Sequence, residues 1–234
     1  MTKLEPDFTG YEELLIDDSP LNRQCIQEAV TVLEGCLNLL NSPNWASKEG
    51  WKQVDKNKVG DVIYSRQDED LGKIFALVAS LEFPDLQQLF QELYYGAEQM
   101  PAWNPEIEQY QKVEDLGKQT ELIYIVSKEI LGGMVKPRDF TDVRCWRQVD
   151  GSFCVAQKSV DHPAFPKVKG IIRGLNLANV TRLSETGQPG VFEFVWLTRI
   201  DLKGQLPKKV VSKAMLHTLL TYVKHLRLHL KSLG

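Results

Sequence analysis

Residues 191–230 read VFEFVWLTRIDLKGQLPKKVVSKAMLHTLLTYVKHLRLHL and place two elements of different period next to each other. The first part alternates between two kinds of side chain, as a β-strand does. One face would carry Phe192, Phe194, Trp196 and Ile200, and the other Glu193, Val195, Leu197 and Arg199. Leu206-Pro207 then opens a helix, because proline suits the first turn, and the following apolar residues recur at helical spacing. We predict a strand over 192–201 and a long amphipathic helix after it.

The sequence before this pair predicts two more helices and a series of strands. Ser19-Pro20 supplies an N-cap followed by proline, and apolar residues repeat at helical spacing until Asn41-Ser42-Pro43. A second helix begins after Asp85 and ends before Met100-Pro101. Turn-forming residues separate most of the β-prone runs. The predicted strands cover residues 51–57, 61–68, 72–83, 107–115, 120–126, 140–149, 153–160, 168–176 and 192–201.

This order of elements predicts an α+β fold. Successive strands with short connections favour an antiparallel sheet, and a sheet that curves around the long C-terminal helix can leave a space inside. We expect residues 19–234 to form one domain around this sheet. Residues 1–18 are acidic and weakly periodic, which predicts a flexible leader with little function.

Composition and charge exclude several classes of protein. The 234 residues carry a formal charge of −3, which argues against a protein dedicated to nucleic acid. The charge is uneven, because basic residues recur from Leu202 to Gly234 while no acidic residue occurs there. A secretory signal and a long apolar span are both missing from the sequence, so we expect a cytoplasmic protein. The four cysteines form no CxxC pair, which favours reduced and mostly buried thiols.

Seven short motifs occur in a fixed order along most of the chain. They are EGW at 49–51, WNP at 103–105, PRDF at 137–140, VRC at 143–145, DLKG at 201–204, LP at 206–207 and HLR at 225–227. In this order they resemble the StAR-related lipid-transfer (START) family. The resemblance is greatest to the sub-family of the steroidogenic acute regulatory protein, to which an insect carotenoid-binding protein also belongs. It implies a helix-grip fold, with a curved antiparallel sheet wrapped around the C-terminal helix, an internal lipid tunnel and no catalysis.

The resemblance and the aromatic strand face together indicate which residues bind the ligand. The expected set is Met100, Trp103, Asn104, Ile125, Arg144, Arg173, Phe194, Trp196, Thr218 and Tyr222. The family places an acidic residue twelve positions before the PRDF proline, facing the arginine of VRC, but here that position is Ile125. Arg144 therefore needs another partner, because a buried guanidinium without one is costly. Without the acid, we also expect a more apolar tunnel.

The segment SKEILGGMVK at 127–136 resembles the lid loop of the family. Its paired glycines would allow movement, and the residues expected to contact lipid are Leu131, Gly132, Gly133, Met134 and Val135. A more apolar tunnel favours a carotenoid cargo, a xanthophyll such as lutein, with cholesterol or another sterol as the alternative. We expect no cofactor besides this cargo. The expected partners are the ligand and, transiently, a membrane surface, and we expect a monomer that does not bind nucleic acid.

Plainer interpretations of the same residues stay open. Met100 and the aromatic strand face fit a filled protein core as well as a cavity wall, and the basic C-terminal helix fits a solvated surface as well as one that meets anionic lipid. His225 and His229 are four apart on a helix, but neither a third metal ligand nor an HExxH pattern accompanies them. Cys145 and Cys154 lack a neighbouring histidine, which favours structural thiols over nucleophiles. The competing functions are an enzyme on a sequestered hydrophobic substrate and a ligand-regulated module.

Overall fold

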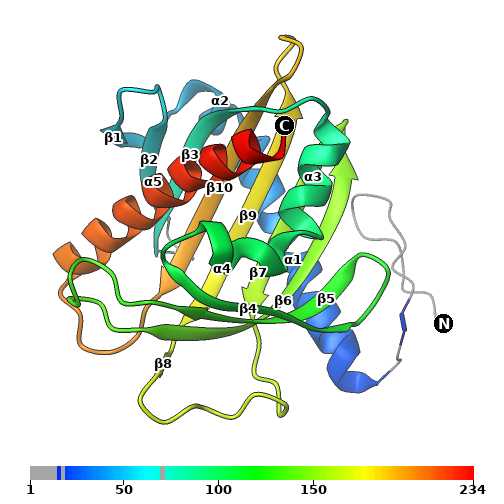
Figure 1. The fold of residues 1–234 in the computed structure, drawn as a ribbon, viewed down its shortest axis with the longest axis vertical. Coiled ribbons are helices and arrows are strands. Elements are labelled where there is room, and N and C mark those ends of the chain that lie inside the picture. The colour runs from blue at the N-terminus through cyan, green and yellow to red at the C-terminus, as the bar shows by residue number, and fades with distance from the viewer. Residues whose placement is uncertain (1–14, 17–18, 69–71) are drawn as a thin grey trace.

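The computed structural model describes residues 15–16, 19–68 and 72–234, and within them ten strands form one strongly curved sheet (Figure 1). The strands are β1 (Lys52–Lys56), β2 (Val62–Asp68), β3 (Gly72–Glu82), β4 (Ile107–Asp115), β5 (Thr120–Ser127), β6 (Arg138–Val149), β7 (Ser152–Ser159), β8 (Ile172–Arg173), β9 (Leu175–Glu185) and β10 (Val191–Asp201). The main path is antiparallel with the order β1-β2-β3-β10-β9-β7-β6-β5-β4, and β8 adds a short parallel pair with β6.

Strands β3 and β10 join the first and last parts of the chain in the middle of the sheet. Their register runs from Val191 opposite Glu82 to Thr198 opposite Phe75. The N-terminal meander and the strand that precedes the last helix are therefore neighbours, although more than 100 residues separate them in sequence. This long-range pairing fixes where the final helix leaves the sheet.

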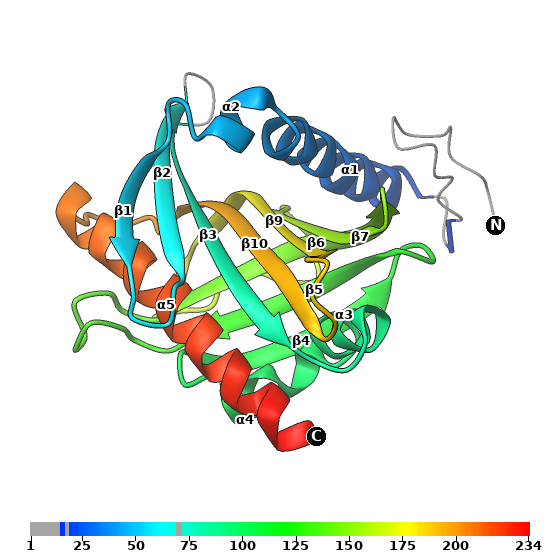
Figure 2. The same cartoon turned by 90° about the horizontal axis from the view of Figure 1, so that it is seen from above.

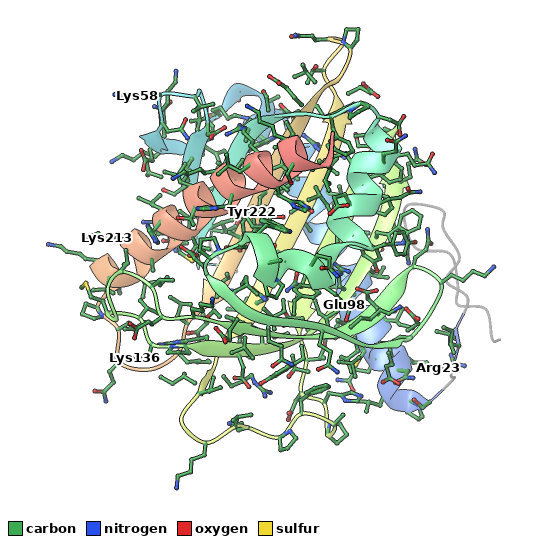
Figure 3. All side chains as sticks on the ribbon, viewed as in Figure 1. Arg23, Lys58, Glu98, Lys136, Lys213 and Tyr222 are labelled. Carbon is green, nitrogen blue, oxygen red and sulfur yellow. The ribbon has the colours of Figure 1, made fainter. Side chains whose placement is uncertain are left out.

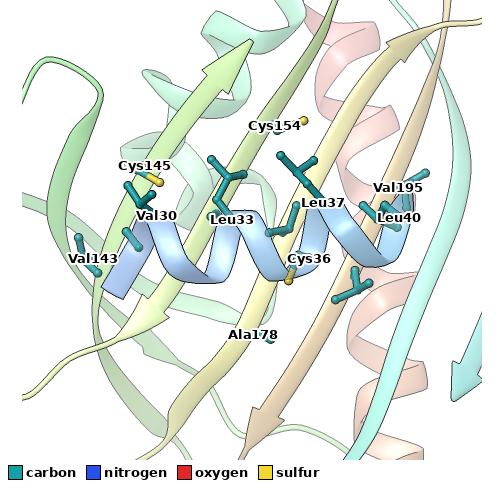
Figure 4. Packing of buried hydrophobic residues seen from close by; sticks show 14 of the residues in the cluster. Val30, Leu33, Cys36, Leu37, Leu40, Val143, Cys145, Cys154, Ala178 and Val195 are labelled. Atoms are coloured by element: carbon teal, nitrogen blue, oxygen red, sulfur yellow. The ribbon is translucent and has the colours of Figure 1, made fainter. Parts of the chain in front are cut away.

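Helix α1 (Pro20–Leu40) covers the outer face of the sheet (Figure 2). It begins after Ser19, whose hydroxyl accepts a hydrogen bond from the backbone N–H of Asn22 at 3.2 Å, as an N-cap does. Its apolar stripe packs on small and branched side chains of four strands (Figure 4). Those labelled there are Val143, Cys145, Cys154, Ala178 and Val195. The short helix α2 (Pro43–Ser47) follows α1.

The remaining helices lie over the inner face of the sheet (Figure 1). They are α3 (Leu86–Tyr94), η1 (Ala97–Gln99), α4 (Met100–Trp103) and α5 (Lys208–Leu233). The apolar stripe of α5 packs against aromatic residues of β10, including Phe192 and Phe194. The buried residues of this stripe are Ala214, Met215, Leu219, Val223, Leu226 and Leu230. The α+β helix-grip arrangement predicted from the sequence is confirmed.

The predicted strand over 168–176 is wrong. The structure has a connection there with only two strand residues, and the long strand β9 begins at Leu175. Val168 and Ile172, the apolar residues that suggested a strand, are 45% and 36% exposed. They do not contribute to the core. A short helix, α4, also forms at 100–103, where the sequence indicated only a break followed by a loop.

The predicted acidic leader over 1–18 lies almost entirely outside the described residues. Leu15 and Ile16 are described, and Leu15 is fully buried. Leu15 forms an antiparallel bridge with Gly117, and the N–H of Ile16 donates to the carbonyl of Leu116 at 3.0 Å. This part of the expected leader is attached to the domain, because a buried leucine beside α1 contributes to the outer core. Within the described parts of the chain, none of the helices is both long enough and apolar enough to span a membrane.

Candidate ligand cavity

The inner face of the sheet, α5 and the segment before β6 enclose a cavity of about 200 Å³. The strands contribute every second residue to its wall, because side chains on one face of a strand recur with a period of two. Eight of the ten predicted ligand residues line it: Met100, Asn104, Ile125, Arg144, Phe194, Trp196, Thr218 and Tyr222. Tyr222 lies between α5 and α4 (Figure 3). These residues surround an open space, so side chains do not completely fill the interior on this side of the sheet.

Two predicted ligand residues, Trp103 and Arg173, do not line the cavity. The Trp103 ring is stacked on His229 of α5, with centroids 5.2 Å apart, and meets the ring of Tyr222 edge-on at 5.5 Å. Trp103 therefore packs α4 against α5. The Arg173 Nη2 donates to the Asp139 Oδ2 at 2.8 Å and to the carbonyl of Phe165 at 3.3 Å. Arg173 fastens the β7–β8 connection to β6, which is a structural role.

The predicted lid loop forms a tight reversal between β5 and β6. The N–H of Ile130 donates to the carbonyl of Val135 at 3.0 Å, and the N–H of Val135 donates back at 3.3 Å. Gly132 and Gly133 have φ values of 64° and 82°, a region that favours glycine.

The five predicted lid residues differ in what they contact. Val135 lines the cavity, whereas Leu131 lines an open groove beside α5. The side chain of Met134 is 53% exposed. Gly132 and Gly133 line neither the cavity nor the groove and supply only the turn. Lys136, the last residue of the loop, and Lys213 on α5 lie at the same end of the molecule in Figure 3.

The partner of Arg144 is Glu121, which the sequence analysis did not identify. Glu121 lies directly opposite Arg144 in the β5–β6 register, and its Oε1 accepts from Arg144 Nε at 2.9 Å and also from Nη2. Nη2 also donates to the carbonyl of Tyr94 at 2.8 Å. Burial lowers the pKa of Arg144, but Tyr110, Tyr94 and Glu121 raise it by more, so the guanidinium is charged.

The acid whose absence suggested a more apolar tunnel is therefore present, at Glu121. The missing acid at Ile125 is replaced by one four residues earlier on the same strand and the same face. Strand positions four apart point to the same side, which is the signal that could have identified Glu121. The two side chains are 5% and 7% exposed, so the carboxylate and the guanidinium form a buried pair.

A second carboxylate, Glu106, lies where α5 meets the start of β4. Its Oε2 accepts from the hydroxyl of Thr218 at 2.8 Å, and its Oε1 is 3.1 Å from the His217 Nε2. Glu106 and Thr218 both line the cavity, whereas the side chain of His217 is 45% exposed. This contact fastens the middle of α5 to the far edge of the sheet, and so helps to close the cavity.

Arg138 joins the two chain segments at the lid end of the cavity. Its guanidinium donates to three backbone carbonyls, those of Lys136 at 2.5 Å, Leu202 at 2.9 Å and Lys203 at 3.3 Å. The first of these carbonyls ends the lid loop, and the other two precede α5. Burial lowers the pKa of Arg138, which is 2% exposed and has only carbonyl partners among the described residues. Arg138 is the arginine of the PRDF motif, and its contacts with these carbonyls were not predicted from the sequence.

The cavity wall also contains uncharged polar residues that the sequence analysis missed. Gln157 of β7 and Asn176, Asn179 and Thr181 of β9 all line it. Behind them the buried Asp142 accepts from the amide nitrogens of Gln157 at 2.5 Å and Asn176 at 2.6 Å. Burial raises the pKa of Asp142, and its hydrogen-bond donors oppose that shift.

The described residues contain no group of three or more histidine, cysteine, aspartate or glutamate side chains placed to hold a metal ion. His229 is engaged otherwise, since its Nε2 is 2.7 Å from the Glu92 Oε1. Cys145 and Cys154 are buried and belong to the outer core under α1, on the face of the sheet opposite the cavity. Burial raises the pKa of Cys154 to about 12, so its thiol is protonated at neutral pH.

Comparisons with known proteins agree with this architecture. The family model described as START domain matches residues 31–234. The human steroidogenic acute regulatory protein, mitochondrial, is 32% identical over 223 residues, covering 94% of this chain and 75% of that protein. The same protein from Gallus gallus is 34% identical over 211 residues, covering 89% and 73%. The structure of human StAR-related lipid transfer protein 5 has a TM-score of 0.81 at 18% identity, covering 91% of this chain and 99% of that one.

Proposed function

The chain belongs to the START domain family, and from this premise we propose that it binds one lipid molecule in the cavity and carries it between membranes without changing it chemically. The cavity is the observation that supports this most. Apolar side chains of the sheet and of α5 surround a space that the lid segment closes at one end. Moving apolar surface from water into such a space is favourable by about 25 cal/mol per Å².

The groups around the cavity support binding rather than catalysis. Cys145 and Cys154 face α1 and not the cavity. The charges of Arg144 and Glu121 compensate each other across β5 and β6, and Glu121 itself does not line the cavity. We therefore propose a carrier, and an enzyme on a sequestered substrate is the outcome that the experiment below must exclude.

The lid end of the molecule is the part that we propose contacts membranes. Met134 is exposed there, and the first turns of α5 carry Lys208, Lys209 and Lys213. A basic residue near an anionic lipid surface contributes roughly 1 kcal/mol of attraction. In this proposal a cytoplasmic monomer approaches a membrane with its lid, and the groove between Leu131 and α5 closes again after the lipid has entered.

The proposed cargo is a sterol or a carotenoid. The sequence favoured a carotenoid such as lutein because an acid was missing beside Arg144, but Glu121 supplies that acid. The cavity volume of about 200 Å³ is also below the range of about 300 to 1,000 Å³ that is usual for ligand pockets. A compact sterol needs less opening of this space than a long carotenoid does. The sterol is therefore the cargo that the geometry favours, and the carotenoid is its competitor.

The test is a transfer assay between donor and acceptor vesicles loaded with equal amounts of cholesterol and lutein, with and without anionic lipid. We expect the protein to carry one lipid per chain, to release it unchanged by mass spectrometry, and to work faster with anionic vesicles. A disulfide between cysteines placed at Leu131 and Leu220, which line the same groove, should stop transfer until it is reduced. Transfer that ignores this lock, or a cargo recovered in altered form, would contradict the proposal.

A further inference from the structure

Five polar side chains lie on one row across the inner face of the sheet. Glu121 of β5 is opposite Arg144 of β6, and Arg144 is opposite Gln157 of β7. Gln157 is opposite Asn179 of β9, and Asn179 is opposite Thr198 of β10. Residues directly opposite each other point to the same face of a sheet, with Cβ atoms about 4.5 to 5.5 Å apart. The row therefore crosses the wall from one side to the other, and its three central residues line the cavity.

The amide of Gln157 is held in one orientation. Its Nε2 donates to the Asp142 Oδ2 at 2.5 Å. A carboxylate accepts hydrogen bonds, so the atom of Gln157 that faces it must be the nitrogen. The Oε1 of Gln157 is left without a hydrogen-bond partner among the described residues. It is an acceptor on a side chain that lines the cavity.

The amide of Asn179 is held in the opposite sense. Its Oδ1 accepts from the indole N–H of Trp196 at 2.6 Å. An indole nitrogen can only donate, so the oxygen of Asn179 must face it and the amide nitrogen must point elsewhere. In the part of the chain that the structure describes, this nitrogen has no partner. The Nη1 of Arg144, the third central residue, is likewise without one, since Nε and Nη2 make all of its hydrogen bonds there.

We propose that Gln157 and Asn179, with Arg144 beside them, recognise a hydroxyl or carbonyl oxygen of the lipid cargo. This rests on the proposed carrier function and deepens it. The row presents a donor, an acceptor and a donor on neighbouring strands. A hydroxyl can satisfy both kinds of group and a carbonyl the donors, whereas a hydrocarbon would bury all three unpaired, which is costly. Asp142 and Trp196 act as positioning residues, because they decide which atom of each amide is free.

The cavity continues on both sides of the row, and its wall is apolar there. Leu183, four residues beyond Asn179 on β9, lines one side, and Phe140, four residues before Arg144 on β6, lines the other. Strands β6 and β9 run in the same direction because each is antiparallel to β7. The bound lipid would therefore have apolar parts on both sides of the oxygen that the row binds. This describes a ring alcohol or ketone better than a plain hydrocarbon.

The experiment compares lipids that differ only in this oxygen. Vesicles carry equal amounts of cholesterol, the corresponding 3-ketone and the hydrocarbon without the oxygen. The protein is recovered and the bound lipids are counted by mass spectrometry, so that an unfolded fraction does not change the ratio. We expect the wild type to prefer each oxygenated lipid over the hydrocarbon by about tenfold or more. Gln157→Met and Asn179→Leu should each reduce the preference for cholesterol about five- to tenfold.

Gln67→Met is the matched control, because it makes the same change as Gln157→Met at an exposed residue of β2 that does not line the cavity. It should leave the preference unchanged. If the wild type binds the three lipids alike, or if both variants keep its preference, the inference about the row is overturned while the carrier function stands. If the wild type takes up no lipid, the carrier function fails and the inference fails with it. Asn179→Val replaces Asn179→Leu if the latter does not fold, with the same expected loss.

Discussion

The buried pair of Glu121 and Arg144 allows a quantitative test of the cavity wall. Glu121→Gln keeps an oxygen that can accept from Arg144 but removes the compensating charge. Breaking a buried pair by removing one charge costs about 3 to 5 kcal/mol. Arg144 keeps the Tyr94 carbonyl at 2.8 Å and the Tyr94 ring, whose centroid is 4.0 Å from Cζ. We therefore expect the lower end, a loss of about 3 kcal/mol in the free energy of unfolding.

Urea unfolding followed by circular dichroism at pH 7 measures this loss. For a chain of this length it corresponds to a fall in Tm of about 6 to 12 °C. The exposed Glu108→Gln, which interrupts only a surface contact with Lys128, is the control and should change stability by less than about 1 kcal/mol. The double variant Glu121→Gln/Arg144→Met should be more stable than the sum of the single changes predicts. Strict additivity, or a Glu121→Gln variant as stable as the wild type, would refute the pairing.

Three further predictions follow from other parts of the structure. In Arg138→Lys, the single ammonium group cannot keep all three carbonyl contacts of the guanidinium. A fluorescent lipid should therefore dissociate from this variant several-fold faster in a stopped-flow experiment. An unchanged dissociation rate would show that Arg138 does not hold the lid end closed. Ala214→Phe places a ring in the cavity and should reduce lipid uptake from vesicles about tenfold or more; wild-type uptake would contradict the assigned cavity. Burial raises the pKa of Cys36 and Cys154 from 9.0 to about 12, so both should resist iodoacetamide at pH 8 in the folded protein, as peptide mass spectrometry can check. A raised folded-state pKa gives stability that is present below pH 9.0 and is lost as the pH rises towards about 12.

The elements with one uniformly apolar face could be predicted from the sequence. Helix α1 and helix α5 each bury a continuous stripe, and β10 has an aromatic face towards α5 and an aliphatic face towards α1. In such elements the hydrophobic period reports the geometry directly. The seven motifs added the order of the elements, and with it the position of the cavity.

Strand β9 could not be predicted in the same way, for a physical reason connected with function. Its outward residues Ala178 and Val180 are apolar, but its inward residues Asn176 and Asn179 are polar because they face the cavity wall and not a packed core. A sequence method that expects apolar inward residues interprets asparagines as turn formers. The strand was therefore placed too early, over the exposed Val168. The hydrophobic periodicity of the sequence could therefore not predict β9, which contributes polar residues to the cavity wall.

The pairing of Arg144 was missed because the family pattern placed its acid at one position only. The face of a strand repeats every second residue, so Glu121 presents a carboxylate to the same side as Ile125. The error changed the expected polarity of the tunnel and with it the preferred cargo. Residues that act through an ion pair are thus better sought along a whole strand face than at a single aligned position.

The two faces of the sheet explain how this chain can keep a hollow interior. A space of about 200 Å³ forgoes the contacts that closely packed side chains would make there, which reduces the net stability of the domain. The outer face offsets this cost with a solid core under α1, where Leu33 and Cys154 are almost fully buried. A lipid that fills the inner space recovers part of the same free energy. The closed, occupied form is therefore the more stable one, and release of the cargo requires a membrane that offers the lipid an equally apolar environment.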